Sequence, residues 1–413
     1  MTNKNTDTSK VIAIGALSFV NFLGFTIFIP VLPFIVRDFG APEWVYGVLL
    51  ASYPLAQFFG APILGEYSDR KGRKPILLIS QFGTMMSWTV VALSYFVSQI
   101  DGIATVWPLG ILFLARIIDG ITGGNVSVAN AYLADITPPE KRTERFGRIG
   151  AIVGVSLLIG PGLGSLSSST RFGYLGLAIL AFIISLVTLL LIWRYLEETL
   201  PESERSIATS RWYQKINIFS RIRNLETRPG GKFMLGLSGG FGVIQAAYQS
   251  IIVLFIIDRF GLSQTELGVF LLFVGSFLIF NQEVMVKLFV RKIGELETFF
   301  AGLAFVAIGF IGITLTSTLW VYTIIYYVLN LGLSLLTPTI RSLLSQSVSN
   351  KKQGEVLGLD ESLRSASMAT MPIVFGALYG AITYRSFYII TAVVVFMMLL
   401  FYFSKSRRKL QER

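Results

Sequence analysis

The sequence predicts an all-α polytopic membrane protein, with twelve transmembrane helices in two pseudo-symmetric halves of six. Three observations lead to this prediction. Only 14% of the 413 residues are charged, whereas 53% are hydrophobic. Apolar runs long enough to cross a bilayer recur along the chain, and basic residues collect on one side of these runs. A soluble chain carries nearer a quarter charged residues, so we expect lipid to surround much of this one.

Each predicted span is near or above the roughly 20 residues that cross a bilayer. The expected helices cover residues 11–36, 44–65, 75–98, 107–134, 149–170, 172–193, 233–257, 265–286, 298–315, 319–340, 357–380 and 386–404. The run from Thr298 to Ile340 is uncharged, but a single helix of that length would be much longer than the bilayer is thick. We therefore divide it into two helices at Thr316-Ser317-Thr318. The polar N-terminus shows no signal peptide pattern.

The basic residues set the orientation. With the N-terminus inside, 28 of the 35 Lys and Arg fall in cytoplasmic segments and three at membrane depth. Only four fall outside: Arg37, Arg171, Arg259 and Arg385. This bias predicts a multi-pass protein of the cell inner membrane with both termini cytoplasmic. The net charge of +11 is also explained, because the excess basic residues would face the cytoplasmic surface of the lipid bilayer. No nucleic acid partner is therefore expected.

The longest loop separates two groups of six predicted helices, and a short basic tail follows the second group. We expect a six-helix bundle at 1–194, a cytoplasmic linker at 195–232, a second six-helix bundle at 233–404 and a basic tail at 405–413. In the linker, Trp212, Ile216, Phe219 and Ile222 have helical spacing among basic residues. This pattern indicates either an interfacial helix or a solvated linker.

The two halves form an internal repeat. A shift of 211 residues places Gly147 on Gly358 and Pro161 on Pro372, and a shift of 222 places Gly72 on Gly294. Two six-helix units repeated in the same orientation are the parallel-repeat architecture of transporters that work by alternating access.

The absence of His and Cys narrows the chemistry. Disulfides, thiolate or imidazole catalysis and the usual zinc sites are excluded, so no catalytic residue, metal or cofactor is predicted and the chain is not expected to be an enzyme. A membrane acyltransferase would need a nucleophile motif, a channel would need a re-entrant filter, and an ATP-driven pump would need a phosphate-binding loop; none is present. Any proton must be carried by carboxylates.

A charged turn joins the second and third predicted helices. It reads Gly65-Glu66-Tyr67-Ser68-Asp69-Arg70-Lys71-Gly72-Arg73-Lys74. Gly65 allows two helices to approach closely, and Gly72 permits a backbone bend that a side chain would hinder. Asp69 and Arg73 are placed to form charge pairs at a helix end. The corresponding loop of the second half is degraded, with only Gly294 retained.

The fourth predicted helix carries a buried charge pair. At 100° per residue one face presents Arg116, Asp119, Gly120, Gly123, Ser127, Asn130 and Ala134, while Asn125 points the other way. A charge near the bilayer centre costs roughly 2.5–3.5 kcal/mol, so this face should meet the bundle interior or a watery cavity. Arg116 and Asp119 form either a structural ion pair or a proton or substrate site.

Other polar residues are also candidates for proton coupling or substrate binding. In the second half Glu283 precedes Lys287, and Asp360 precedes Arg364, each by four residues, which favours pairing. With Glu361 and Arg341 these charges form either a cytoplasmic gate or further proton-coupling groups. Paired polar residues on one helix face are candidate substrate contacts: Tyr53 with Gln57, and Gln245 with Gln249.

These motifs resemble those of the major facilitator superfamily. The loop from Gly65 to Lys74 matches the pattern G-x-x-x-D-R-x-G-R-K at all key positions. The resemblance implies that Gly65, Asp69, Arg70, Gly72 and Arg73 form a conformational latch with Asp135. Gly147, Gly160, Pro161 and Gly164 resemble the antiporter signature of helix 5, although two of its glycines are Ser here. That signature implies a close-packed, bent helix and is commoner in exporters.

Within the superfamily, the chain resembles the drug–proton antiporters, and most of all the tetracycline-resistance-type exporters. The resemblance rests on Ile29-Pro30-Val31-Leu32-Pro33 and Asp119-Gly120-Ile121-Thr122-Gly123-Gly124, and more loosely on Gln353 to Gly358. It implies proton-coupled export of amphipathic small molecules by a monomer, with Arg116 tied to proton coupling. An importer or uniporter of a small metabolite is the alternative. Those exporters carry an Asp where this chain has Asn21, a candidate substrate contact that cannot take up a proton.

Overall fold

The computed structural model describes residues 2–138, 141–205, 222–223, 225, 227, 230–348 and 353–411. Within these residues every regular element is a helix. The chain divides into two compact units. Unit 1 comprises Met1–Ala41, Val48–Ile216 and Gln264–Val269, and unit 2 comprises Pro42–Gly47, Asn217–Ser263 and Phe270–Arg413.

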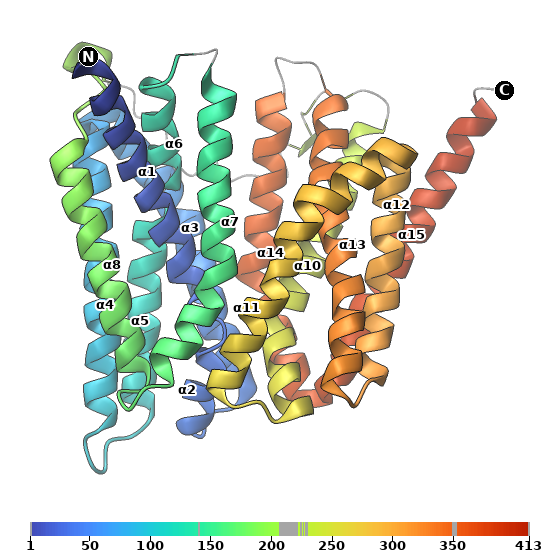
Figure 1. Cartoon of the computed structure of the whole chain (residues 1–413), viewed down its shortest axis with the longest axis horizontal. Helices are drawn as coiled ribbons and strands as arrows, with labels where there is room; N and C mark the ends of the chain where they lie inside the picture. The colour runs from blue at the N-terminus through green and yellow to red at the C-terminus, as the bar shows by residue number, and fades with distance from the viewer. Residues whose placement is uncertain are drawn as a thin grey trace. The chain divides into compact units, whose positions relative to one another are not determined.

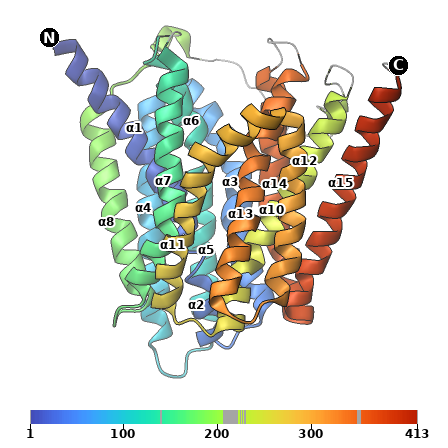
Figure 2. The same ribbon diagram turned by 45° about the vertical axis from the view of Figure 1, so that its right-hand side comes forward.

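Unit 1 holds most of the first eight α-helices. They are α1 (Thr2–Thr26), α2 (Leu32–Asp38), α3 (Glu43–Lys71), α4 (Arg73–Ser98), α5 (Val106–Gly123), α6 (Val126–Asp135), α7 (Arg142–Ser168) and α8 (Tyr174–Tyr195). Within the unit, α4 packs against α5 and α8, and α1 packs against α7 and α8 (Figures 1 and 2). A short 3₁₀ turn, η2 (Glu202–Glu204), follows α8.

Unit 2 holds most of the remaining elements. They are α10 (Gly231–Phe260), α11 (Gln264–Phe280), the π-helical turn η4 (Asn281–Met285), α12 (Val286–Leu315), α13 (Leu319–Gln346), α14 (Gln353–Ile382), the 3₁₀ turn η6 (Thr383–Arg385) and α15 (Ser386–Gln411). Here α12 packs against α13 and α15, and α10 packs against α14.

The predicted twelve-helix membrane architecture is confirmed. The described residues contain ten helical stretches long and apolar enough to span a membrane. Two of them, Gln264–Leu315 with 52 residues and Val356–Tyr402 with 47, are each long enough for two passes. Each contains a break, at Gly294 and at Thr383–Arg385 respectively, so the ten stretches supply twelve passes. Large apolar side chains such as Ile79, Ile183 and Leu190 are exposed on these helices, as a lipid environment requires.

The prediction of one helix over 11–36 is wrong. The helix α1 ends at Thr26, and α2 begins only at Leu32. In between, the amides of Ile29 and Val31 donate to carbonyls three residues back, which is the pattern of tight turns. Pro30 and Pro33 lack the N–H that a continuous helix would need, so the chain breaks there.

The predicted helix over 107–134 is also two helices. It breaks at Gly124 and Asn125, between α5 and α6. The single polar face predicted from Arg116 to Ala134 therefore stops at Gly123, and Ser127 and Asn130 are exposed on α6. Asn125, predicted to point away from that face, is fully buried. The signal for this break was the Gly123-Gly124 pair, because adjacent glycines interrupt helices.

The loop between the eighth and ninth passes is shorter than predicted. The helix continues from α11 through the π-helical turn into α12, and only Gly294 leaves helical geometry. Gly294 has φ 78° and ψ 168°, and Gly72 has φ 100° and ψ 158°. This region is open essentially to glycine alone. The two glycines that the repeat overlays thus have the same backbone conformation.

The predicted interfacial helix lies largely outside the described residues, since Trp212, Ile216 and Phe219 belong to none of the described ranges. Ile222 is described as helical together with Arg223.

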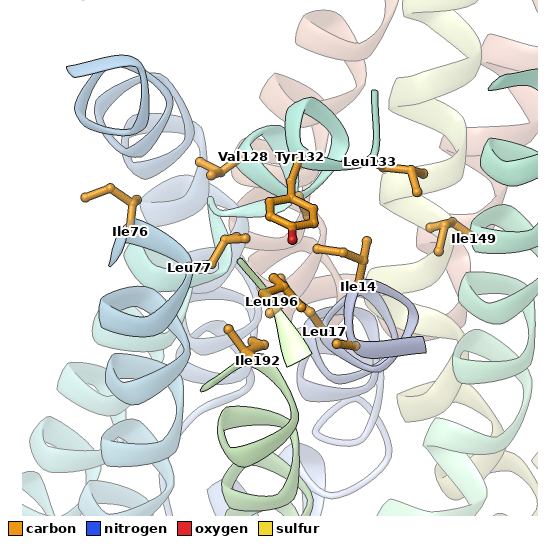
Figure 3. Packing of buried hydrophobic residues seen from close by; sticks show 12 residues of the cluster. Ile14, Leu17, Ile76, Leu77, Val128, Tyr132, Leu133, Ile149, Ile192 and Leu196 are labelled. Carbon is orange, nitrogen blue, oxygen red and sulfur yellow. The ribbon is translucent and has the colours of Figure 1, made fainter. Parts of the chain in front are cut away.

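An apolar cluster at one end of unit 1 fixes α6 in place. Its members come from α1, α4, α6, α7 and the end of α8: Ala13, Ile14, Leu17, Ile76, Leu77, Val128, Ala129, Tyr132, Leu133, Ile149, Ile192 and Leu196. Tyr132 points from α6 into the cluster, toward Leu77 and Ile14 (Figure 3). Its hydroxyl accepts a hydrogen bond from the amide of Glu197 at 3.2 Å, so the same cluster also positions the chain that leaves α8.

Candidate functional site

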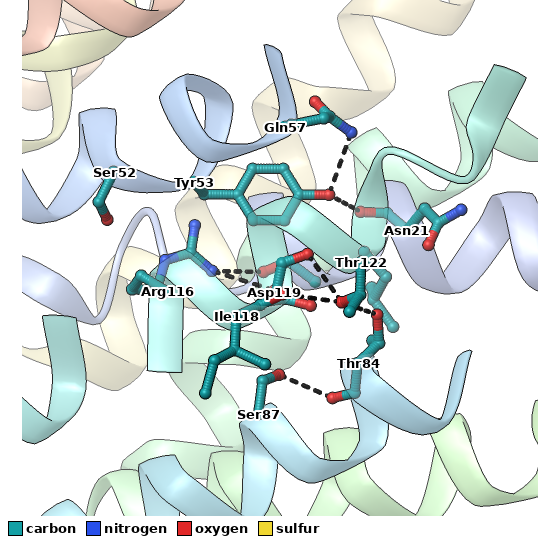
Figure 4. Close-up of polar contacts among 12 residues, drawn as sticks. Asn21, Ser52, Tyr53, Gln57, Thr84, Ser87, Arg116, Ile118, Asp119 and Thr122 are labelled. Carbon is teal, nitrogen blue, oxygen red and sulfur yellow. Dashed lines mark hydrogen bonds and ion pairs between the residues drawn. The ribbon is translucent and has the colours of Figure 1, made fainter. Parts of the chain in front are cut away.

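A buried ion pair lies inside the α5 span of unit 1. Arg116 is 1% exposed and Asp119 is 4% exposed. Nη1 of Arg116 lies 3.4 Å from Oδ2 of Asp119, so the pair predicted from the i,i+3 spacing forms (Figure 4). This distance exceeds the 2.7–2.9 Å typical of charge-assisted hydrogen bonds, so the two charges are loosely joined.

Two aromatic rings flank the guanidinium. Its central carbon lies 4.7 Å from the ring centre of Phe28 and 4.8 Å from that of Tyr53. Phe28 stacks on Trp88 with a ring separation of 5.2 Å. Cation–π contacts stabilise a desolvated cation by about 2 kcal/mol, which offsets part of the cost of burying Arg116. Nη1 also donates to the carbonyl of Gly24 at 3.3 Å.

Hydroxyl groups of α4 lie beside the Asp119 carboxylate. Thr84 and Ser87 are hydrogen-bonding neighbours of this carboxylate. Thr84 also contacts the hydroxyl of Thr122 at 2.9 Å, which holds α4 against α5. A carboxylate with these neutral neighbours and one cation can be neutralised by a proton without leaving the site.

A chain of amide groups connects α1, α4 and the α5–α6 break. Nδ2 of Asn21 donates to Oδ1 of Asn125 at 2.6 Å, and Nδ2 of Asn125 donates to Oγ of Ser80 at 2.9 Å. The hydroxyl of Tyr53 donates to the carbonyl of Asn21 at 3.2 Å, and Gln57 donates to that hydroxyl at 3.4 Å (Figure 4). The structure thus brings Asn21, Tyr53 and Gln57 together beside the ion pair. Sequence reasoning missed Asn125 and Ser80.

Close helix packing in unit 1 depends on glycines that the sequence singled out. A β-carbon on Gly160 would collide with Thr26, and one on Gly164 would collide with the backbone of Ile27. These two glycines of α7 therefore let it lie directly against α1, as the helix 5 signature implies. Pro161 lies within α7, and Gly147 lies in its first half.

The charged turn forms a cluster at the end of α3, the start of α4 and the end of α6, here called the rim cluster: Asp69, Arg73, Asp135, Glu198 and Thr199. Nη1 of Arg73 lies 2.5 Å from Oδ1 of Asp69, and Nε lies 3.5 Å from Oδ2 of Asp135. Arg70 instead pairs with Glu66 at 3.3 Å. Gly65 lies near the end of α3, where a β-carbon would meet the hydroxyl of Ser127 at 3.6 Å.

Glu198 is a member of the rim cluster that sequence reasoning missed. Its two carboxylate oxygens accept hydrogen bonds from the backbone amides of Arg73, at 2.8 Å, and Lys74, at 3.1 Å. The next residue, Thr199, donates from its hydroxyl to Oδ2 of Asp135 at 2.9 Å. The first residues after α8 are therefore bound to the predicted latch. No local pattern marks an acid 125 residues away as the cap of α4.

The predicted charges of unit 2 form two separate groups. Glu283, in the π-helical turn, pairs with Lys287 at 2.6 Å, as the spacing predicted, and both side chains are exposed. Asp360 is buried, but it does not form the predicted pair with Arg364. Its carboxylate accepts a hydrogen bond from Ser238 and lies 4.0 Å from Nε of Arg341. Glu361 pairs with Arg341 at 3.1 Å.

The remaining substrate candidates lie in unit 2. Gln245 and Gln249 are half-buried on α10. One turn from Gln245, the hydroxyl of Tyr248 donates to that of Tyr326 at 2.9 Å within a group of aromatic rings.

The charge pair, the rim cluster and the twelve passes all point to a transporter, and comparison with known proteins decides the family. The profile of the Major Facilitator Superfamily matches residues 14–369 and 289–413. The chain belongs to this superfamily. It is therefore a multi-pass membrane transporter rather than an enzyme, and it acts on a small-molecule substrate.

Curated superfamily relatives align over most of their length. The class C tetracycline resistance protein of Escherichia coli is 30% identical over 384 residues, covering 91% of this chain and 90% of the relative. The quinolone resistance protein NorA of Staphylococcus aureus (strain COL) is 25% identical over 372 residues, covering 87% of each.

Solved structures of other transporters share the fold at lower identity. A bacterial homolog of the human lysosomal transporter Spinster, inward-facing and unoccupied, matches with a TM-score of 0.74 and 16% identity over 99% of this chain and 98% of its own. The human organic anion transporter MFSD10 (TETRAN) matches with a TM-score of 0.66 and 19% identity, covering 96% and 99%.

Proposed function

We propose that this protein is a proton-coupled exporter of amphipathic small molecules, a multidrug efflux antiporter of the bacterial inner membrane. The observation that carries the proposal is the buried Arg116–Asp119 pair inside a membrane-spanning helix. A lone buried charge is costly there, so the pair is retained for a function or as a structural lock. The likeness to tetracycline and quinolone resistance proteins supports the first reading.

In this proposal Asp119 carries the proton and Arg116 supplies its counter-charge. When Asp119 is ionised, the pair is neutral and can bind substrate. When Asp119 is protonated, Arg116 loses its partner, so the charge balance of the site changes. Such a change can bias which of two conformations is more stable, which couples proton entry to substrate exit.

The conformational change is a rocking of the two six-helix halves around a midplane site. We place both termini and the rim cluster in the cytoplasm and propose that the protein acts as a monomer. Arg73, Asp69 and Asp135 then serve as the latch, and Asn21, Tyr53, Gln57, Gln245 and Gln249 as substrate contacts.

Transport by the purified protein in proteoliposomes tests the proposal. An imposed pH gradient should drive flux of a lipophilic cation through the wild type, and Asp119→Asn should reduce it to the level of protein-free liposomes. Asp101→Asn, in an exposed loop, is the matched control and should transport normally. If Asp119→Asn transports at the wild-type rate, Glu283, Asp360 or Glu361 carries the proton. If the gradient drives no flux in the wild type, the protein is not a proton antiporter.

A further inference from the structure

The two hydroxyl groups of α4 beside Asp119 each donate their single hydrogen elsewhere. A hydroxyl carries one hydrogen and can accept through two lone pairs. Oγ of Ser87 donates to the backbone carbonyl of Thr84 at 2.7 Å. Oγ1 of Thr122 donates to the carbonyl of Ile118 at 2.9 Å, so in its 2.9 Å contact with Thr84 it accepts, and Thr84 donates (Figure 4). Toward Asp119, Ser87 and Thr84 therefore present lone pairs rather than hydrogens.

This arrangement suits a neutral carboxylic acid at Asp119. A protonated carboxyl has a hydrogen to donate, whereas an ionised one can only accept and would meet the lone pairs of both hydroxyls. The 3.4 Å separation between Nη1 of Arg116 and Oδ2 of Asp119 agrees, because two full charges in contact draw together to about 2.7–2.9 Å. An ionised Asp119 would need one of the two hydroxyls to turn toward it.

Thr84 is the hydroxyl that can turn more readily. Its 2.9 Å bond to Thr122 is near the long end of the usual range for hydroxyl donors. The 2.7 Å bond of Ser87 has the preferred length and ends on a carbonyl. The Thr84 hydroxyl also lies within hydrogen-bonding reach of the Asp119 carboxyl. Its hydrogen thus has two alternative acceptors on α5, the hydroxyl of Thr122 and the carboxylate of Asp119.

We propose that Thr84 is a positioning residue for the proton of Asp119. When Asp119 is ionised, the Thr84 hydroxyl donates to its carboxylate. When a proton binds, the acid donates to the Thr84 oxygen, and the Thr84 hydrogen turns to Thr122. Thr122 thereby keeps a buried hydrogen from losing its acceptor in the neutral state. This inference rests on the proposed function and names the groups that regulate proton binding at the same site.

The charged or titratable groups that face this carboxyl come from two helices. Among the described residues they are Arg116 on α5 and Tyr53 on α3, both buried. Besides the hydroxyls already named, α1 and α4 present Gly24 and Trp88, which are neutral. Because the variants below leave Arg116 and Tyr53 in place, a changed proton affinity of Asp119 can be traced to a hydroxyl.

Infrared difference spectroscopy of the purified protein tests the proposal, because the carbonyl band of a protonated carboxyl disappears as the group ionises. The Asp119 band is the one missing in Asp119→Asn, and its amplitude against pH gives a midpoint. Thr84→Val should raise the midpoint by about 1 pH unit, because a hydrogen bond to a charged group stabilises more than one to a neutral group. Thr122→Val should lower it by about 0.5–1 pH unit, because the neutral state loses its acceptor.

Two further variants are controls. Thr84→Ser keeps the hydroxyl and should restore the wild-type midpoint. Thr188→Val removes a buried threonine hydroxyl from α8 and should leave the midpoint unchanged. A merely structural role of Thr84 and Thr122 would not move the midpoint in opposite directions. Unchanged midpoints, shifts of the same sign, a Thr84→Ser midpoint equal to that of Thr84→Val, or a wild type without a titrating Asp119 band would each overturn the proposal.

The two expected shifts are independent of each other and of transport. If Thr84→Val does not fold, Thr122→Val alone decides: a lower midpoint supports the proposal, and an unchanged or higher one overturns it. Opposite shifts without gradient-driven flux in proteoliposomes would disprove the proposed export and leave the proton site standing. Gradient-driven flux with unchanged midpoints would do the reverse.

Discussion

The carboxylate of Glu198 lies over Gly72, in the space that a β-carbon on this glycine would occupy. From there it accepts hydrogen bonds from the first two amides of α4. The exposed amides and the dipole at a helix N-terminus favour an anion, so Glu198 acts as a cap supplied from outside the helix. The glycine of the charged turn therefore has two roles, an unusual backbone conformation and room for this carboxylate.

Alanine at Gly72 should destabilise the protein more than alanine at Gly294. Both glycines have the same positive-φ conformation, which costs a non-glycine residue about 1–3 kcal/mol. Of the two, Gly72 has an obstacle, since no atom of the described residues lies within 4 Å of a β-carbon at Gly294. Thermal unfolding in detergent measures the difference. The excess at Gly72 should shrink in Gly72→Ala/Glu198→Ala, and equal melting temperatures of the two single variants would contradict the clash.

Asp69→Asn should loosen the rim cluster without altering substrate recognition. Asp69 and Asp135 share Arg73, so removing one carboxylate weakens the hold on α6. The chain has no native cysteine, so a single cysteine at Ile136 reports access to this region. Faster labelling in Asp69→Asn than in the parent, with unchanged substrate affinity, is the expected result, and Asp101→Asn is the control. Equal labelling rates would count against the latch.

Metal-chelated tetracycline should not be the main substrate. Asn21 is neutral, and its amide is held by Asn125 at 2.6 Å, so it offers a divalent metal no carboxylate oxygen. Resistance in a host without its own pumps tests this, and we expect little protection against tetracycline. Strong resistance that is lost in Asp119→Asn but kept in Asn21→Ala would refute the prediction, because it would show that Asp119 replaces the missing acid at position 21.

The contact between Lys10 and Glu197 should stabilise the protein only above acidic pH. Nζ of Lys10 lies 2.5 Å from Oε2 of Glu197, and this hydrogen bond, with the lysine charge, lowers the pKa of Glu197 below its usual 4.5. A lowered pKa means that the contribution is present above about 4.5 and is lost as the pH falls through the folded-state value. The difference in melting temperature between wild type and Lys10→Met should therefore be present at pH 7 and shrink as the pH falls below the folded-state pKa of Glu197. A difference independent of pH would refute it.

Most of the fold could be predicted from the recurring apolar runs and from the distribution of basic residues between them. Lipid requires long apolar helices with internally satisfied backbones, so each pass is visible as an apolar run with few or no charges. The failures were local and had local causes: prolines broke the first predicted helix, and two adjacent glycines broke the fourth. Both signals were in the sequence, but the overall hydrophobicity of the runs concealed them.

The sequence by itself determined the membrane class, the twelve passes, the charged turn and the Arg116–Asp119 pair, because each depends on composition or on spacing within one helix. Tertiary structure alone decided that Glu198 caps α4, that Asn125 joins Asn21 to Ser80 and that Asp360 meets Ser238 rather than Arg364. These contacts join residues far apart in the chain, and spacing along one helix holds no information about which neighbouring helix packs against it.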